Sequence, residues 1–264
     1  MVEEEDAYKI HKVSVSSKPI FKNIDATYIL TMEDSNRFEK LEKRIFELSK
    51  RTFLQINKGF KKFTKKDVNS TCKDIVHACK NVCKHAAKYE NILILEDDAI
   101  IKNMDDIKSF KNVDKFIKEN KFNVYSLGSI GFVIPTNSIL HYKFLGFLGF
   151  AQSNIYSKNI RKELLNTSIR NINHIDAHFI SKYDLKYTYY KPLMVQYFTN
   201  TENMKEWGWN ERKLKIEIAI TKLFIFFLQD ILHLDRQLWG WNIIYTINHL
   251  PIIVLSGAIC SFII

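Results

Sequence analysis

The sequence predicts an α/β fold in which helices flank a mixed β-sheet, followed by a hydrophobic helical tail at the C-terminal end. Three observations lead to this prediction. Residues 91–101 read NILILEDDAII, and their aliphatic run is typical of a short strand that is buried on both faces. Strand-like and helix-like stretches follow one another from residue 24 to residue 197, as in βα units. Residues 238–264 contain no charged residue.

Composition sets the size of the core and the kind of partner. A chain of 264 residues that is 46% hydrophobic can bury a full core as one domain with an appendage. The net charge of +10 suits anionic partners such as nucleotide diphosphates, nucleic acid or an acidic membrane face. The lysines between residues 58 and 66 lack the interleaved aromatic residues of a nucleic-acid module, so nucleic acid is not an expected partner.

The cysteines are expected to be reduced. Cys72, Cys79 and Cys83 share one face of a predicted helix, and Cys260 lies in the tail. No CxxC pair is present and the acidic start MVEEEDAY is not a secretory signal, so reduced core thiols are favoured over a zinc site.

The first half of the chain begins with a loose polar lead-in, predicted for residues 1–23. Residues 25–32 form a predicted strand, residues 34–36 a turn, and the apolar spacing of residues 38–48 predicts a helix. Further elements are predicted as a strand over 52–57, a helix over 69–89 and the strand that begins at residue 91.

The second half continues the alternation. The expected elements are a helix over 104–119, a strand over 123–128, a glycine-containing loop over 128–149, a strand over 150–157, a capped helix over 157–166, a helix over 174–183 and a strand over 185–196. The loop has no GxGxxG or P-loop spacing.

The acid cluster Glu96, Asp97 and Asp98 falls where the buried strand ends, and ligands of open α/β sheets bind at the carboxyl ends of strands. Three adjacent carboxylates repel one another, so a divalent cation completed by a substrate diphosphate is the simplest expected partner. A solvated turn or the first turn of a helix is the alternative. Arg37, in the first turn of a predicted helix, suggests a ligand anion or an ordinary exposed arginine.

The tail, residues 211–264, is predicted to be helical. Its segment 238–264 is long enough to span a bilayer, and the basic residues before it would keep the folded domain on the cytoplasmic side of a membrane. The alternative is a hydrophobic helical hairpin packed on the domain, which the polar Asn242, Asn248 and His249 favour.

Four segments in this order resemble the family 25 glycosyltransferases, the lipooligosaccharide-biosynthesis type that includes collagen galactosyltransferases. YILTMEDSNRFEKLEKRI resembles the opening strand with its N-L-x-x-S-x-x-R pattern, although Thr31 replaces the Asn and the loop is one residue shorter. HACKNVCKHAAKYENILILEDDA resembles the S-H helix and L-E-D-D strand, with Val76 in place of the Ser. GFAQSNIYSKNIRKELL, and HIDAHF with KPLMVQ, resemble the later segments.

The resemblance implies a GT-A-like, Rossmann-type domain over residues 24–210. It implies a metal-dependent transfer of a sugar from a nucleotide-sugar donor, a UDP-hexose such as UDP-galactose or UDP-glucose, to a glycan, glycolipid or protein acceptor. The implied metal is Mn²⁺ or Mg²⁺, held by Asp98 with Asp97 or Glu96, and His178 or His174 could complete its shell. The implied catalytic base is Asp176, and the donor-binding residues are Thr31, Ser35, Arg37, His77 and Gln196.

Two other classes stay open on the sequence. The same acids could serve a metal-dependent phosphohydrolase or nucleotidyltransferase, and the shortened first motif with the unusual tail is compatible with a catalytically degenerate, membrane-attached scaffold.

Overall fold

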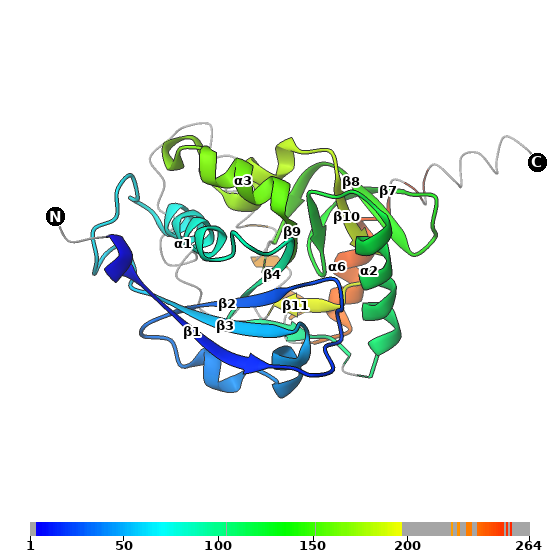
Figure 1. The fold of residues 1–264 in the computed structure, drawn as a ribbon. Coiled ribbons are helices and arrows are strands. Elements are labelled where there is room, and N and C mark those ends of the chain that lie inside the picture. Colours follow the sequence, from blue (N-terminus) through cyan, green and yellow to red (C-terminus); the bar gives the residue numbers. More distant parts are fainter. Residues whose placement is uncertain are drawn as a thin grey trace, which may run out of the picture.

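The computed structural model describes residues 4–103, 105–150, 152–196 and 237–250, together with residues 223, 226, 227, 231–233, 252 and 254. Its centre is a mixed sheet of strands β1 (Tyr8–Val15), β2 (Ala26–Met32), β3 (Arg51–Asn57), β4 (Asn91–Glu96), β6 (Val124–Ser126), β7 (Ile130–Pro135), β8 (His141–Gly149), β9 (Ser153–Ser157) and β10 (Lys186–Tyr189). The nine strands follow the order β1-β3-β2-β4-β9-β6-β10-β8-β7 (Figure 1). The predicted mixed sheet flanked by helices is therefore confirmed.

The aliphatic run of β4 lies in the middle of this sheet. Ile92 and Ile94 point into one hydrophobic core, whereas Leu93 and Leu95 point into the other. Strand β4 pairs with β2 in parallel and with β9 antiparallel. Burial on both faces is what a continuous aliphatic strand predicts, and the acids follow at the carboxyl end of the strand.

One face of the sheet is covered by α1 (Thr71–His85) and α3 (Lys158–Asn166), which lie side by side in Figure 1. Helix α1 begins at Ser70, whose hydroxyl accepts a hydrogen bond from the Lys73 amide. Cys79 and Cys83 are free, buried thiols on its inner face, as predicted for core cysteines. Burial raises the pKa of Cys83 to about 12, so this thiol is protonated and unreactive.

The other face is covered by α2 (Ile107–Glu119) and by a 3₁₀ turn, η3 (Lys43–Glu47). Phe110, Val113 and Ile117 of α2 pack on the sheet together with Ile45 of η3. The predicted single helix over residues 38–48 is wrong, because Leu41 and Glu42 are extended and separate η3 from a first 3₁₀ turn, η2 (Arg37–Lys40). Short turns can bury the same apolar residues as a helix, so spacing alone does not distinguish the two.

Three other segments differ from their predicted structure. Tyr8–Val15, inside the expected loose lead-in, form the edge strand β1 along β3. The expected loop over 128–149 is the hairpin β7–β8, and the expected helix over 174–183 is a short π turn, η5 (Ile175–Phe179), followed by a 3₁₀ turn. Strand β1 pairs with β3 and strand β8 pairs with β10, and local periodicity does not report such pairing with distant parts of the chain.

The predicted strand over 185–196 is divided between two sheets. Its first part is β10, and its second part is β11 (Met194–Gln196), which pairs with β5 (Ala99–Ile101). In this small ribbon Gln196 is paired with Ala99, the residue after Asp98. The end of β11 is thereby placed beside the acid cluster.

Helix α6 (Gly240–Ile247) belongs to the predicted tail and packs on the domain. Trp241 and Ile244 are fully buried and contact Val195 of β11, with Ile100 of β5 beside them. No helix in the described part of the chain is both long and apolar enough to cross a bilayer. Residues 251, 253 and 255–264 of the predicted anchor lie outside the described residues, and the domain boundary at residue 210 stays a prediction.

Candidate functional site

The carboxyl ends of β2, β3 and β4 meet at one edge of the sheet and line a pocket of about 430 Å³. These strands are parallel, so the turns that follow them gather at the same place. The lining includes Thr31, Ser35 and Arg37 at and after the end of β2, and Glu96, Asp97 and Asp98 at and after the end of β4. Six of the residues that the sequence singled out therefore share one pocket.

Asp97 is held by two hydroxyl groups from the neighbouring strand and turn. Its Oδ2 atom accepts hydrogen bonds from Thr31 Oγ1 and from Ser35 Oγ, each at 2.7 Å. Thr31 is thus able to bond the acid cluster although it stands where the family pattern has Asn. The two bonds fix the orientation of the Asp97 carboxylate.

Arg37 supplies positive charge to the cluster. Its Nη1 atom lies 3.2 Å from Asp98 Oδ2 and 3.6 Å from Asp97 Oδ1, and its side chain is 29% exposed. The guanidinium thus bridges two of the three carboxylates and keeps access to the pocket. Among the described residues, Arg37 is the cation that forms ion pairs with these acids.

Asp98 is oriented from the opposite side by Gln196, whose Nε2 donates to Asp98 Oδ2 at 2.9 Å. Its second oxygen, Oδ1, is buried and has no hydrogen-bond partner among the described residues. Burial raises the pKa of Asp98, and the Gln196 amide and Arg37 oppose this rise. Burial also raises the pKa of Glu96, and the charges of Asp98, Asp176 and Asp97 add to it. Glu96 keeps some accessible surface, but protein atoms surround its carboxyl group.

Asp176, the predicted base, lies outside the residues that line this pocket. Its Oδ2 accepts from the Phe150 amide at 3.0 Å, and its Oδ1 accepts from the Ala177 amide at 2.6 Å. Its charge nevertheless contributes to the raised pKa of Glu96, which places the two carboxyl groups within electrostatic reach.

The two predicted histidines are not brought to the acids. His77 is buried in α1, where its ring stacks on Tyr8 and its Nδ1 lies 2.5 Å from the Tyr8 hydroxyl. His178 Nδ1 accepts a hydrogen bond from the Asn173 amide. Burial lowers the pKa of His178, and the nearby Lys182 and His174 lower it further. Neither histidine is among the residues that line the pocket.

The donor atoms at the pocket suit a hard divalent cation that shares its ligands with a substrate. No cluster of three or more His, Cys, Asp or Glu side chains in the described part of the chain is arranged to enclose a metal. Mg²⁺ and similar ions are commonly held by one or two carboxylates and the phosphates of the substrate, not by an all-protein cage. Asp97 and Asp98, with the unpartnered Asp98 Oδ1, fit this second arrangement.

Sequence reasoning missed the opposite end of the pocket. Asn57, Phe60 and Asp74 line it there, and the buried Lys65 joins two of them through its ammonium group. Lys65 belongs to a lysine-rich stretch that reads as a solvated loop, so no local signal distinguishes it from its exposed neighbours.

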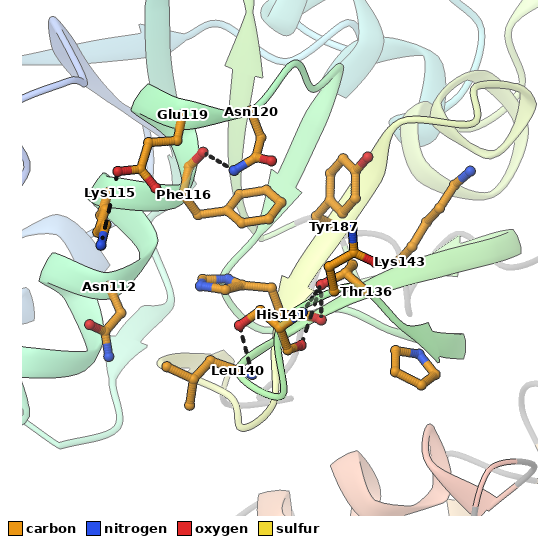
Figure 2. Close-up of a pocket in the computed structure, with 13 residues that line it drawn as sticks. Asn112, Lys115, Phe116, Glu119, Asn120, Thr136, Leu140, His141, Lys143 and Tyr187 are labelled. Atoms are coloured by element: carbon orange, nitrogen blue, oxygen red, sulfur yellow. Dashed lines mark hydrogen bonds and ion pairs between the residues drawn. The ribbon is translucent and has the colours of Figure 1, made fainter.

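A second cavity, of about 530 Å³, lies between α2 and the β7–β8 turn (Figure 2). Phe116, His141 and Tyr187 form an aromatic cluster in it, with ring centroids 4.4 Å apart for Phe116 and His141. Burial lowers the pKa of His141 to about 4. Its lining contains a single carboxylate, Glu119, so the paired acids make the first pocket the candidate site.

Comparisons with known proteins give distant structural likenesses. No protein-family model matches the sequence, and no curated protein matches it. Among solved structures, A197 from STIV is 12% identical with a TM-score of 0.42, covering 68% of this chain and 87% of that one. UDP-glucose pyrophosphorylase complexed with UDP-glucose is 10% identical with a TM-score of 0.38, covering 62% and 72%.

A glycosyltransferase involved in the glycosylation of the major capsid of PBCV-1 is 9% identical with a TM-score of 0.32, covering 53% of this chain and 63% of that one. At these TM-scores the likenesses assign neither a family nor an activity to this chain.

Proposed function

We propose that this protein is a metal-dependent glycosyltransferase that uses a nucleotide-sugar donor, of the type found in glycosyltransferase family 25. The donor would be a UDP-hexose such as UDP-galactose or UDP-glucose, and the acceptor a glycan, glycolipid or protein. The observation that carries the proposal is the pairing of Asp97 and Asp98 with Arg37 in a pocket at the carboxyl ends of three parallel strands. Ligands of open α/β sheets bind at this edge.

The acids of the cluster share one role in this proposal, which is to hold the metal. Asp98, with Asp97 or Glu96, would hold Mn²⁺ or Mg²⁺, and such an ion neutralises negative charge on a leaving diphosphate. Gln196 and Thr31 hold the two aspartates in place from either side. Arg37, at 29% exposure, is positioned to contact the diphosphate directly. A guanidinium suits this task because it forms strong bonds with phosphate oxygens.

The acceptor hydroxyl requires a base in an inverting reaction, and we assign this role to Asp176. Both of its oxygens accept a backbone amide, and each keeps a lone pair that can accept the hydroxyl proton. His178 stays a predicted metal ligand, and His77 a predicted donor-binding residue. Membrane attachment through residues 238–264 also stays a prediction, which carbonate extraction of the full-length protein would test.

The test is thermal-shift binding of full-length protein to UDP-, GDP- and CMP-sugars with and without Mn²⁺. A ligand that binds the native state raises its apparent stability. We expect a shift that requires both the metal and one class of nucleotide. It should be lost in Asp98→Asn and kept in the control Asp105→Asn, which removes an exposed carboxylate a few residues away. A folded protein that responds to no donor would overturn the proposal.

A further inference from the structure

Lys65 is an unusual lysine, because its side chain is fully buried beside the pocket. Its Nζ donates to Asp74 Oδ1 at 2.5 Å and to Asn57 Oδ1, and it lies 4.7 Å from the centre of the Tyr8 ring. Lysines are almost never fully buried unless they are paired. Asp74 provides that pairing, and Asn57 is the second group that the ammonium holds.

This contact determines which way the Asn57 amide faces. An ammonium group has only donors, so the Asn57 atom that faces Lys65 must be the carbonyl oxygen. The NH₂ group of Asn57 then faces away from Lys65, and Asn57 lines the pocket. No described residue accepts a hydrogen bond from its Nδ2. The pocket is therefore provided with an oriented hydrogen-bond donor.

The same network positions an aromatic residue. Asp74 Oδ2 accepts a hydrogen bond from the Phe60 backbone amide at 3.0 Å, and Phe60 also lines the pocket. The walls nearby are apolar, with Leu30, Met32 and Ile75. Apolar walls with an aromatic residue among them are suited to a nucleobase, since bases stack on aromatic rings.

The distance from Asn57 to the acids fits the length of a nucleoside diphosphate. Asn57 ends β3 and is paired with Met32 of β2, while Asp97 and Asp98 follow β4 on the other side of β2. Two strand spacings separate β3 from β4, about 10 Å. A nucleoside diphosphate can thus place its phosphates at Asp98 and Arg37 and its base at Asn57.

We propose that Asn57 reads the donor's base and that Lys65 is the positioning residue that keeps the Asn57 NH₂ group facing it. The inference rests on the proposed function. Uracil and guanine carry an oxygen at the exocyclic position where cytosine and adenine carry an amino group. An amide donor held in one orientation bonds the first pair and opposes the second. The site therefore selects uridine or guanosine diphosphates over cytidine or adenosine diphosphates.

The experiment measures binding of UDP, GDP, CDP and ADP to the full-length protein in the presence of Mn²⁺ by calorimetry. We expect the wild type to bind UDP or GDP at least about tenfold more tightly than CDP and ADP, since an unmatched polar group at a buried contact is costly. In Asn57→Asp one oxygen still faces Lys65 and the other faces the pocket as an acceptor. This variant should reverse the preference toward CDP or ADP.

Two further variants separate base reading from a general loss of binding. Asn57→Ala should reduce the preference without creating the opposite one. Asn171→Asp adds the same negative charge as Asn57→Asp at an exposed position and should leave the preference unchanged.

The outcomes distinguish this inference from the proposed function. A wild type that binds the four diphosphates equally, or an Asn57→Asp variant that keeps the wild-type preference, overturns the role of Asn57 and leaves the nucleotide site standing. A folded wild type that binds none of them overturns both proposals.

Discussion

Arg37 is the residue on which the charge balance of the acid cluster depends. It lies within 3.6 Å of both Asp97 and Asp98, and its charge lowers the pKa of Glu96 and Asp98 against the effect of burial. A carboxyl group whose pKa is raised in the folded state stabilises the fold at low pH, and this contribution is lost as the pH rises through the folded pKa. Arg37 limits that loss at neutral pH.

Arg37→Met should therefore make stability fall more steeply with rising pH. Without the guanidinium, Glu96 and Asp98 retain their protons to higher pH in the folded state, and ionising them costs more. We expect the free energy of unfolding of the variant to be about 1–3 kcal/mol lower than that of wild type at about pH 8, with a smaller difference at about pH 5. Urea unfolding across this range measures it. The control Arg170→Met removes an exposed arginine, and an equal loss there would contradict the explanation.

His141 gives a second prediction, of opposite sign. Burial lowers its pKa from the ordinary 6.5 to about 4, and its Nδ1 lies 2.8 Å from the Tyr125 hydroxyl. Between these two pH values the unfolded chain binds a proton that the folded protein does not, so stability should fall as the pH falls from 6.5 to 4. His141→Gln should flatten this part of the urea-midpoint profile, whereas His11→Gln, at an exposed site, should leave it unchanged.

At the scale of elements, α6 joins the predicted tail to the strand that carries Gln196. Trp241 is fully buried against this ribbon, while Trp239 on the same segment is 55% exposed. Trp241→Ala should destabilise the protein by about 3–5 kcal/mol, since it removes a large buried side chain. Trp239→Ala should change stability by less than about 1 kcal/mol. Equal effects of the two substitutions in urea unfolding would show that α6 is not part of the core.

The elements that the sequence predicted well are those with a complete local signal. Strand β4 has a continuous aliphatic run, and α1 has an apolar face and a Ser70 cap, so each could be placed from its own residues. Strands β1 and β7 gain their structure from partners β3 and β8, and β7 contains glycine, which suggests a loop. The apolar residues of η2 and η3 have the spacing of one helix, so periodicity does not reveal the break between the two turns.

The same distinction applies to the site. Thr31, Arg37 and Asp98 could be placed together because each lies at or after the carboxyl end of a strand, and parallel strands bring their ends to one edge. His77 was predicted from a motif position on α1, but helical spacing does not decide whether a side chain contacts the pocket or Tyr8. Lys65 could not be selected, because only the folded chain shows which lysine of a lysine-rich stretch is buried.

At the scale of the whole molecule, the net charge of +10 should attract anionic ligands before they reach any contact with the pocket. We expect the affinity for UDP to fall several-fold as NaCl is raised from about 0.05 M to about 0.5 M, because salt screens exposed charges. Uridine, which has no diphosphate, should show little change in the same titration. If the affinity for UDP does not change with salt, exposed charges do not contribute to binding, and the electrostatic attraction comes from buried groups alone.

The position of α6 in the chain has a consequence for synthesis. A polypeptide leaves the ribosome with its N-terminal end first, and folding can begin before the chain is complete. The segments that carry Asp98 and Gln196 therefore emerge well before Trp241 and Ile244, which cover Ile100 and Val195 in the finished protein. While α6 is still inside the ribosome, a nascent chain that has already folded its sheet would expose Ile100 and Val195 as an apolar surface next to the acid cluster.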